Sequence, residues 1–188
     1  MASNFIARMI RWSAWTGCEA GLEHAEISPV DGGVELAGVV IGQNGTMRYG
    51  ITYRVRVDAA WRTRDVRIRT AAGRVLHLES NGQGIWRMNG AERPDLQGCL
   101  DIDIQATPAT NTLPIRRLGL KAGESLEIRL CYIAVPSLDV SPHNQRYTAL
   151  EPDRLYRFES LDSDFTADLP VDQDGFVRDY PGLFRRLP

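Results

Sequence analysis

The sequence lacks the features that define several large classes of protein. Its three cysteines, Cys18, Cys99 and Cys131, are widely spaced and form no CxxC pair, so we expect reduced thiols rather than a disulfide framework or a zinc site. No run approaches the roughly 20 apolar residues that a membrane-spanning helix needs. Arg8 and Arg11 interrupt the N-terminal apolar stretch, which therefore does not fit a secretory signal. These absences predict a soluble, cytoplasmic protein.

Motifs for cofactors and for hydrolytic chemistry are missing as well. The glycines of the segment 38–42 match neither the GxGxxG nor the GxxxxGK[ST] spacing, which disfavours a nucleotide site. The histidines, His24, His77 and His143, are far apart, and no serine stands in a GxSxG context, so a catalytic triad has no support. We therefore expect no cofactor, no bound metal and no catalytic residue of a familiar motif.

Charge of neither sign dominates the chain. With 22 basic and 24 acidic residues the net charge is −2, which gives no general attraction to nucleic acid, and we expect no such partner. A local excess of positive charge exists between Arg48 and Arg74. This segment contains the acidic residues Asp58 and Asp65 and a larger number of arginines (48, 54, 56, 62, 64, 67, 69 and 74). These arginines could form a groove for an anionic head group or nucleic acid, but we favour an outer sheet face on which they pair with acidic residues across strands.

What the sequence does contain is alternation of apolar and polar residues. This pattern predicts half-buried strands over residues 51–57, 100–104 and 126–132. Turn signals rich in glycine and asparagine separate the strands at short intervals, as at 31–33, 44–45, 81–82, 89–90 and 174–175. The combination predicts a mainly β protein of hairpin-connected antiparallel strands, and residues 1–188 are expected to form one domain.

One segment predicts a helix, from about Thr110 to Leu118. Thr110 or Asn111 can cap its start, Pro114 is tolerable in the first turn, and Gly119 can end it. Apolar residues at 113, 115 and 118 would then face a curved sheet. We expect this helix to fill the middle of a rolled sheet.

Two aspartates on the strand over 100–104 are candidate functional groups. Asp101 and Asp103 share one strand face, so their Cα atoms should lie roughly 6.6 Å apart. Carboxylates at this spacing could act as acid and base on a glycoside or hold a divalent metal. The more ordinary interpretation, which we favour, is that they pair with arginines or face solvent.

The four tryptophans, Trp12, Trp15, Trp61 and Trp86, lie in or beside expected strands. A large aromatic side chain in such a position more often fills core volume than binds a ligand, although some of them could line a pocket. A rolled sheet with an aromatic and aliphatic interior is a suitable container for an apolar ligand, because curled sheets have concave interiors.

Several long segments resemble, in the same order, the bacterial glycolipid-binding family that was formerly a domain of unknown function. The likeness is carried by residues 53–64, 98–103, 107–118, 145–148 and 171–183 and covers nearly the whole chain. The resemblance implies a spiral β-roll, in which a many-stranded sheet wraps around a single α-helix. It also implies a homodimer that binds a glycolipid or a related amphiphile.

The leading hypothesis is therefore a non-enzymatic protein that holds a lipid or glycolipid inside a rolled sheet. The candidate ligand-binding residues are Trp61, Trp86, Asp101, Asp103, Arg116 and Arg117. Charges so close to the core must be paired, because an isolated buried ion is strongly unfavourable. Two alternatives stay open: an enzyme that acts on glycosyl or acyl substrates through Asp101 and Asp103, and a protein-interaction module that uses the arginine-rich face or the segment 180–186.

Overall fold

The computed structural model describes residues 6–16 and 21–188 and consists mainly of two β-sheets. In spatial order the larger, ten-stranded sheet contains β14 (Asp179–Tyr180), β15 (Phe184–Arg186), β1 (Arg8–Ala14), β2 (Gly21–Val30), β3 (Gly33–Asn44), β4 (Met47–Asp58), β5 (Thr63–Thr70), β6 (Val75–Ser80), β7 (Trp86–Met88) and β8 (Ala91–Glu92). The five-stranded sheet contains β13 (Thr166–Pro170), β12 (Leu155–Ser160), β11 (Val140–Glu151), β10 (Ser125–Ile133) and β9 (Asp101–Ile104).

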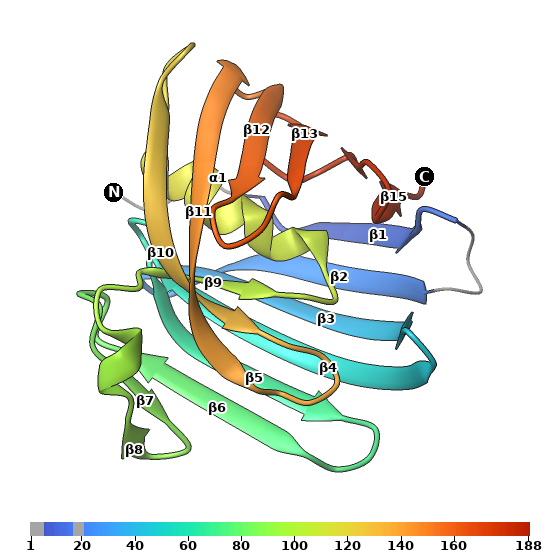
Figure 1. The fold of residues 1–188 in the computed structure, drawn as a ribbon, viewed down its shortest axis with the longest axis vertical. Coiled ribbons are helices and arrows are strands. Elements are labelled where there is room, and N and C mark those ends of the chain that lie inside the picture. The colour runs from blue at the N-terminus through green and yellow to red at the C-terminus, as the bar shows by residue number, and fades with distance from the viewer. Residues whose placement is uncertain (1–5, 17–20) are drawn as a thin grey trace.

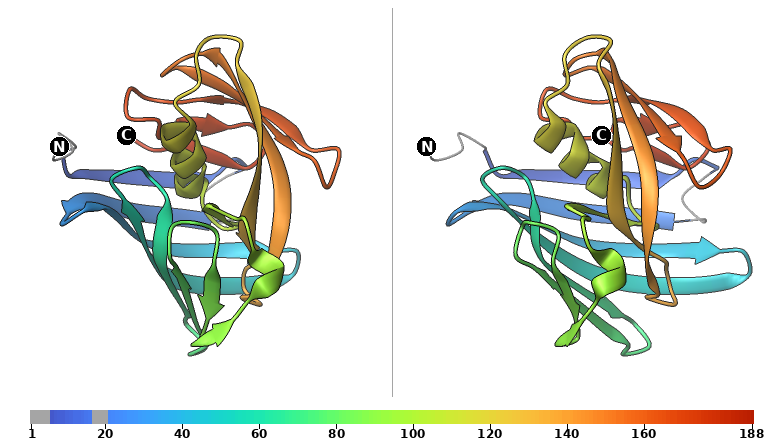
Figure 2. Two further views of the ribbon diagram at one scale, coloured as in Figure 1. Left: turned by 90° about the vertical axis from the view of Figure 1, so that its left-hand side faces the viewer. Right: turned by 60° about the vertical axis from the view of Figure 1, so that its left-hand side comes forward.

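The two sheets curl around α1 (Thr112–Leu118), which is the one α-helix of the described residues (Figure 1). Seen from the side, the helix lies inside the curve, between the blue-to-green strands of the larger sheet and the orange strands of the smaller one (Figure 2). This arrangement confirms the predicted spiral β-roll. None of the helices that the structure describes is long and apolar enough to cross a membrane.

Strand β4 shows most clearly how alternation builds the larger sheet. Ile51, Tyr53 and Val55 are buried against the interior, whereas Thr52 and Arg54 point outward. The expected strand 126–132 fits the pattern less well, since the first part of β10 extends beyond the core and leaves Leu126 exposed.

Tight turns connect most neighbouring strands. Asn89 and Gly90, between β7 and β8, have φ angles of 50° and 85°, the left-handed pair that a two-residue hairpin turn requires. One pairing departs from the antiparallel prediction: β9 and β10 run parallel. The connection between these strands passes through the helical segment, and a crossover of this length allows parallel pairing.

The helical segment begins earlier than predicted, in a different geometry. A 3₁₀ turn, η3, spans Pro108–Asn111 and precedes α1, and the Thr107 side chain caps it by accepting a hydrogen bond from the Ala109 amide. Asn111 stands at the start of α1 but makes no side-chain cap. Gly119 ends the helix in the left-handed conformation with φ 56°, as predicted. Pro108 fixes the backbone for the first turn, so the cap lies one residue before it.

The helix joins two clusters of buried side chains. Leu113 belongs to the core beneath the larger sheet, which also contains Trp12 and Trp86. Ile115 belongs to a second core beneath the smaller sheet, with Tyr147 and others. The short helix therefore fills the interior of the roll. Cys99 and Cys131 are buried free thiols, and Cys18 lies outside the described residues.

The C-terminal segment packs against the rest of the chain. β15 pairs with β1, so the segment 180–186 extends the larger sheet. Asp172 is 5% exposed, and its Oδ2 atom lies 3.2 Å from Nη1 of Arg8 and 2.7 Å from Nη1 of Arg186. This carboxylate therefore connects residues near the two ends of the chain. Arg185 lies over the ring of Trp15 at 4.5 Å from its centroid.

Candidate ligand-binding cleft

A cleft of about 500 Å³ lies between the two sheets. One wall comes from β1 to β4, and the other from the smaller sheet, the segment before α1 and the C-terminal strands. This volume is within the range of small-molecule sites in proteins. Its lining falls into a polar group and an aromatic group.

Glu23 on β2 is the most unusual side chain of the polar group, because it is 2% exposed on a strand face that is otherwise apolar. The hydroxyls of Tyr53 and Thr107 both donate hydrogen bonds to its Oε1 atom, each at 2.6 Å. The other oxygen, Oε2, is buried and receives no hydrogen bond from the described residues. Within residues 6–16 and 21–188, its hydrogen-bond partners include no basic side chain.

The environment of Glu23 shifts its protonation equilibrium. Burial raises the pKa of this carboxyl from 4.5 to about 7, although the hydrogen bonds from Thr107 and Tyr53 act in the opposite direction. Burial and the nearby Glu23 charge also raise the pKa of Tyr53 well above its usual value, so this hydroxyl keeps its proton and remains a donor. Near neutral pH, Glu23 exists in both its charged and its neutral form.

A glycine makes room for the Tyr53 contact. Gly38 on β3 is the register partner of Tyr53 on β4, and the tyrosine ring lies over it. A Cβ atom at position 38 would lie 2.4 Å from two ring carbons, far closer than van der Waals contact allows. The absence of a side chain at this position therefore lets Tyr53 reach Glu23 across β3.

Asp103 on β9 carries the second carboxylate of the cleft. Gln145 donates a 2.7 Å hydrogen bond to its Oδ2 atom, and the Thr110 hydroxyl lies 3.4 Å from its Oδ1 atom. Burial raises the pKa of Asp103, opposed mainly by these hydrogen bonds. Asn111 also lines the cleft: its amide donates to the Tyr147 hydroxyl at 2.9 Å, while its Oδ1 atom is buried and receives no hydrogen bond from the described residues.

Tyr132 and His143 complete the polar group. Their rings stack with centroids 4.4 Å apart and an interplanar angle of 14°. Burial, with a smaller contribution from the charge of Asp103, raises the pKa of Tyr132 to about 12, so its hydroxyl stays protonated. Tyr132 is the register partner of Asp103, so this stacked pair lines the cleft beside that carboxylate.

The aromatic group is contributed by β12, β14, β15 and the loop before β13. Phe158, Phe165 and Tyr180 contact one another with ring centroids 6.0 to 6.1 Å apart, and Phe184 contacts Tyr180 at 6.2 Å. All four line the cleft together with Leu183. The same cleft thus offers hydrogen-bonding groups and an extended apolar surface.

Of the six residues that the sequence suggested as ligand contacts, Asp103 lines this cleft and the other five are placed elsewhere. Asp101 is fully buried, and Arg117 donates to both of its oxygens through two guanidinium nitrogens, at 2.9 Å from Nε to Oδ1 and 2.6 Å from Nη2 to Oδ2. Arg116 lies over the ring of Trp61, 5.1 Å from its centroid. The two aspartates therefore have different partners: Asp101 pairs with an arginine, whereas Asp103 accepts a hydrogen bond from Gln145.

Trp86 is a core residue. It is 1% exposed, and its indole nitrogen donates a 2.8 Å hydrogen bond to the carbonyl oxygen of Cys99. Trp61 is 8% exposed and has a φ angle of 62° in the turn between β4 and β5. Neither tryptophan is among the residues that line the cleft.

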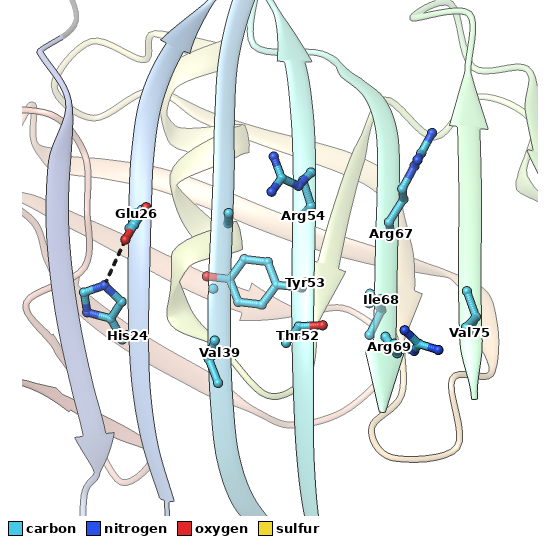
Figure 3. A pocket seen from close by; sticks show the side chains of 12 residues that line it. His24, Glu26, Val39, Thr52, Tyr53, Arg54, Arg67, Ile68, Arg69 and Val75 are labelled. Atoms are coloured by element: carbon cyan, nitrogen blue, oxygen red, sulfur yellow. Dashed lines mark hydrogen bonds and ion pairs between the residues drawn. The ribbon is translucent and has the colours of Figure 1, made fainter. Parts of the chain in front are cut away.

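The arginine-rich segment lies on the outer face of the larger sheet, as expected from its sequence. Arg54 and Arg56 pair with Glu35 on the neighbouring strand, and Arg67 pairs with Asp65. A second, outward-facing hollow of about 640 Å³ is lined in part by Arg54, Arg67 and Arg69, and Figure 3 shows it with the His24–Glu26 contact at one side. Of the three arginines that line this hollow, Arg54 and Arg67 already have acidic partners, so it is a weaker candidate for a binding site.

The sequence interpretation did not include Glu23, Asn111 or His143 among candidate site residues. A signal was present for Glu23, because it has the same strand parity as Ala25 and Ile27, which are both buried. An acidic residue in register with apolar ones marks a charge on the inner face. No group of three or more histidine, cysteine, aspartate or glutamate residues within 6–16 and 21–188 is arranged to hold a metal ion.

Comparison with known proteins agrees with the architecture. A DUF1089 family protein from Pseudomonas aeruginosa has a crystal structure that superimposes with a TM-score of 0.80 at 39% sequence identity, covering 89% of this chain and 92% of that chain. A search of curated proteins returned no match. Residues 9–186 match the family described as "Putative glycolipid-binding". Together with the β-roll just described, this match shows that the chain belongs to that family.

Proposed function

We propose that this protein binds an amphiphile, of the lipid or glycolipid class, in the cleft between its two sheets and does so without catalysing a reaction. The observation that carries the proposal is the divided lining of one cleft. Hydrogen-bonding groups around Glu23 and Asp103 suit a polar headgroup, and the rings of Phe158, Phe165 and Phe184 suit an apolar chain. The family description points to the same class of ligand.

The geometry gives less support to an enzyme that uses Asp101 and Asp103. An acid and base pair needs two carboxyls that are both free to exchange protons with a substrate. Asp101 is fully buried and its two oxygens are bound by Arg117, so one member of the pair is committed to an ion pair. A binding role requires no such exchange.

Native mass spectrometry of the gently purified protein, followed by organic extraction, tests the binding role. We expect a discrete bound amphiphile. Phe165→Ser, a change in the cleft, should reduce the bound fraction, whereas Ile85→Ser should not, since Ile85 is exposed and does not line the cleft. Absence of any amphiphile, together with no binding in a lipid panel, would refute the proposal.

We also propose that the protein is a cytoplasmic homodimer, as the family resemblance implies. The same native mass spectra report the oligomeric state, and a monomeric mass across the concentration range would contradict the dimer. Fractionation of cells tests the location.

A further inference from the structure

We propose that the polar group of the cleft is a headgroup site that selects an uncharged, hydroxyl-rich group such as a glycosyl unit and rejects phosphate and other anionic headgroups. This inference rests on the proposed binding function and specifies its ligand. Three features carry it: unsatisfied acceptors, the absence of cationic side chains and the position of the carboxylates.

The first feature is that the polar group has acceptors to spare. Glu23 Oε2 and Asn111 Oδ1 are both buried without a hydrogen-bond donor among the described residues. In each case the rest of the side chain is fixed, because Tyr53 and Thr107 hold the other oxygen of Glu23 and the Asn111 amide is bound to Tyr147. Free rotation therefore cannot bring these two acceptors to other partners.

Buried acceptors of this kind gain stability only from a molecule that supplies donors. A hydroxyl group can donate one hydrogen bond and also accept, whereas the oxygens of an ionised phosphate only accept. A sugar ring carries several hydroxyls on a compact frame and can reach more than one acceptor at once. Its hydroxyls therefore match Glu23, Asn111 and Asp103.

The second feature is the lack of cationic partners for an anion. Among the described residues that line the cleft there is no lysine or arginine. The nearest arginines of the helix are already engaged, Arg117 with Asp101 and Arg116 with the ring of Trp61. Phosphate sites in proteins rely on arginine, lysine or backbone N–H groups, and this lining provides no such side chain.

The third feature is that two carboxylates face the same space. Glu23 and Asp103 both line the cleft from opposite sheets, and no arginine or lysine of the described residues pairs with either of them. His143 is stacked on Tyr132, and its Nδ1 atom lies 4.0 Å from Asp162. An anionic headgroup in this position would meet like charge in a poorly solvated site, which is strongly unfavourable.

Two probes with one chain length test the selectivity: octyl glucoside, below its critical micelle concentration, and octyl phosphate. Binding of each to the full chain is measured by isothermal titration calorimetry at about pH 8, above the pKa of about 7 for Glu23. We expect the dissociation constant of octyl glucoside to be at least about tenfold lower than that of octyl phosphate. Glu23→Gln should reduce the ratio of the two dissociation constants about tenfold. The glucoside loses a hydrogen bond to a charged group, and the phosphate no longer meets the repulsive charge of Glu23.

Control measurements distinguish the headgroup selectivity from the proposed binding of an amphiphile. Glu26→Gln makes the same change on the exposed side of β2 and should leave the ratio unchanged. Asp103→Asn provides a second cleft variant if Glu23→Gln does not fold, and should also lower the ratio. Equal or tighter binding of octyl phosphate would overturn the headgroup assignment alone, whereas failure of both probes to bind would overturn the proposed function as well.

Discussion

Two buried carboxylates of this fold, Asp101 and Glu23, are held in contrasting ways. Both are almost completely removed from solvent, with 0% and 2% exposure, and burial raises the pKa of each. Both oxygens of Asp101 accept hydrogen bonds from the Nε and Nη2 atoms of Arg117, which opposes that shift. From the part of the chain that the structure describes, Glu23 receives two hydroxyl groups, both on one oxygen.

The contrast indicates what each carboxylate does. A buried ion pair with complete hydrogen bonding belongs to the framework, where it fixes α1 against β9. A buried acid without a basic partner stores an unfavourable interaction in the fold, and groups of this type concentrate at functional sites. Four substitutions can test whether Asp101 and Arg117 form a framework pair and whether Glu23 is a site acid.

The largest effect is expected from breaking the framework pair. Arg117→Leu would leave the Asp101 carboxylate buried without its partner, and we expect a loss of about 3 to 5 kcal/mol in the free energy of unfolding. Urea denaturation monitored by tryptophan fluorescence measures it. The double variant Arg117→Leu with Asp101→Asn should recover part of the loss, and a single-variant loss below about 1 kcal/mol would show that the pair is not structural.

Glu23→Gln should stabilise the protein at alkaline pH. The folded-state pKa of Glu23 is about 7 against 4.5, so the fold binds the proton more tightly than the unfolded chain does. Wild-type stability should therefore fall as pH rises from about 4.5 to above 7, by about 3 kcal/mol from this residue at 1.36 kcal/mol per unit. The glutamine variant should lack this part of the fall.

Urea denaturation at about pH 5 and about pH 8 measures the difference. Asp101 and Asp103 also have raised pKa values and contribute in the same direction, so the comparison is between the slopes of wild type and variant. Glu26→Gln, on the exposed face, serves as the control. Identical pH slopes for wild type and Glu23→Gln would contradict the assignment of a buried, unpaired acid.

Tyr53→Phe removes one of the two hydrogen-bond donors to Glu23 and keeps the aromatic ring. We expect a loss of about 1 kcal/mol, larger at pH 8 than at pH 5, because the hydrogen bond is stronger when the carboxyl is charged. The same denaturation series detects it. A loss independent of pH would mean that the hydroxyl contributes only through packing.

The smallest effect should come from an exposed pair in the smaller sheet. Arg157 binds Asp168 across β12 and β13, and this contact lowers the pKa of Asp168. Both side chains are more than 40% exposed, so solvent and salt screen the interaction. Asp168→Asn should leave the midpoint of urea denaturation almost unchanged. A shift of this midpoint as large as that of Arg117→Leu would show that exposed and buried pairs contribute equally to stability.

Much of the roll could be predicted from the sequence, because local rules determine its parts. Alternation located β4, and the positions of Pro114 and Gly119 located the helix to within a few residues. The parallel pairing of β9 and β10 and the 3₁₀ turn before α1 were not predicted, since both depend on how the helical segment packs. The need for paired charges near the helix was predicted, and Asp101 with Arg117 meets it.

The cleft could not be predicted in the same way. Glu23 and Thr107 are 84 residues apart and meet only because the sheet curls until its strands face the smaller sheet. Strand parity could have shown that Glu23 points inward, but the partners that satisfy one of its oxygens come from β4 and from the turn before α1. Curvature, which no local pattern encodes, therefore creates the site.

The glycine at position 38 has a consequence for reading the sequences of relatives. Its missing Cβ atom and the ring of Tyr53 occupy the same space, so neither position can change freely without the other. In an alignment, a larger residue in place of Gly38 should be accompanied by a smaller residue in place of Tyr53. Relatives with that exchange would lose a donor to the buried acid, and these two columns would together divide the family into members with and without this form of the site.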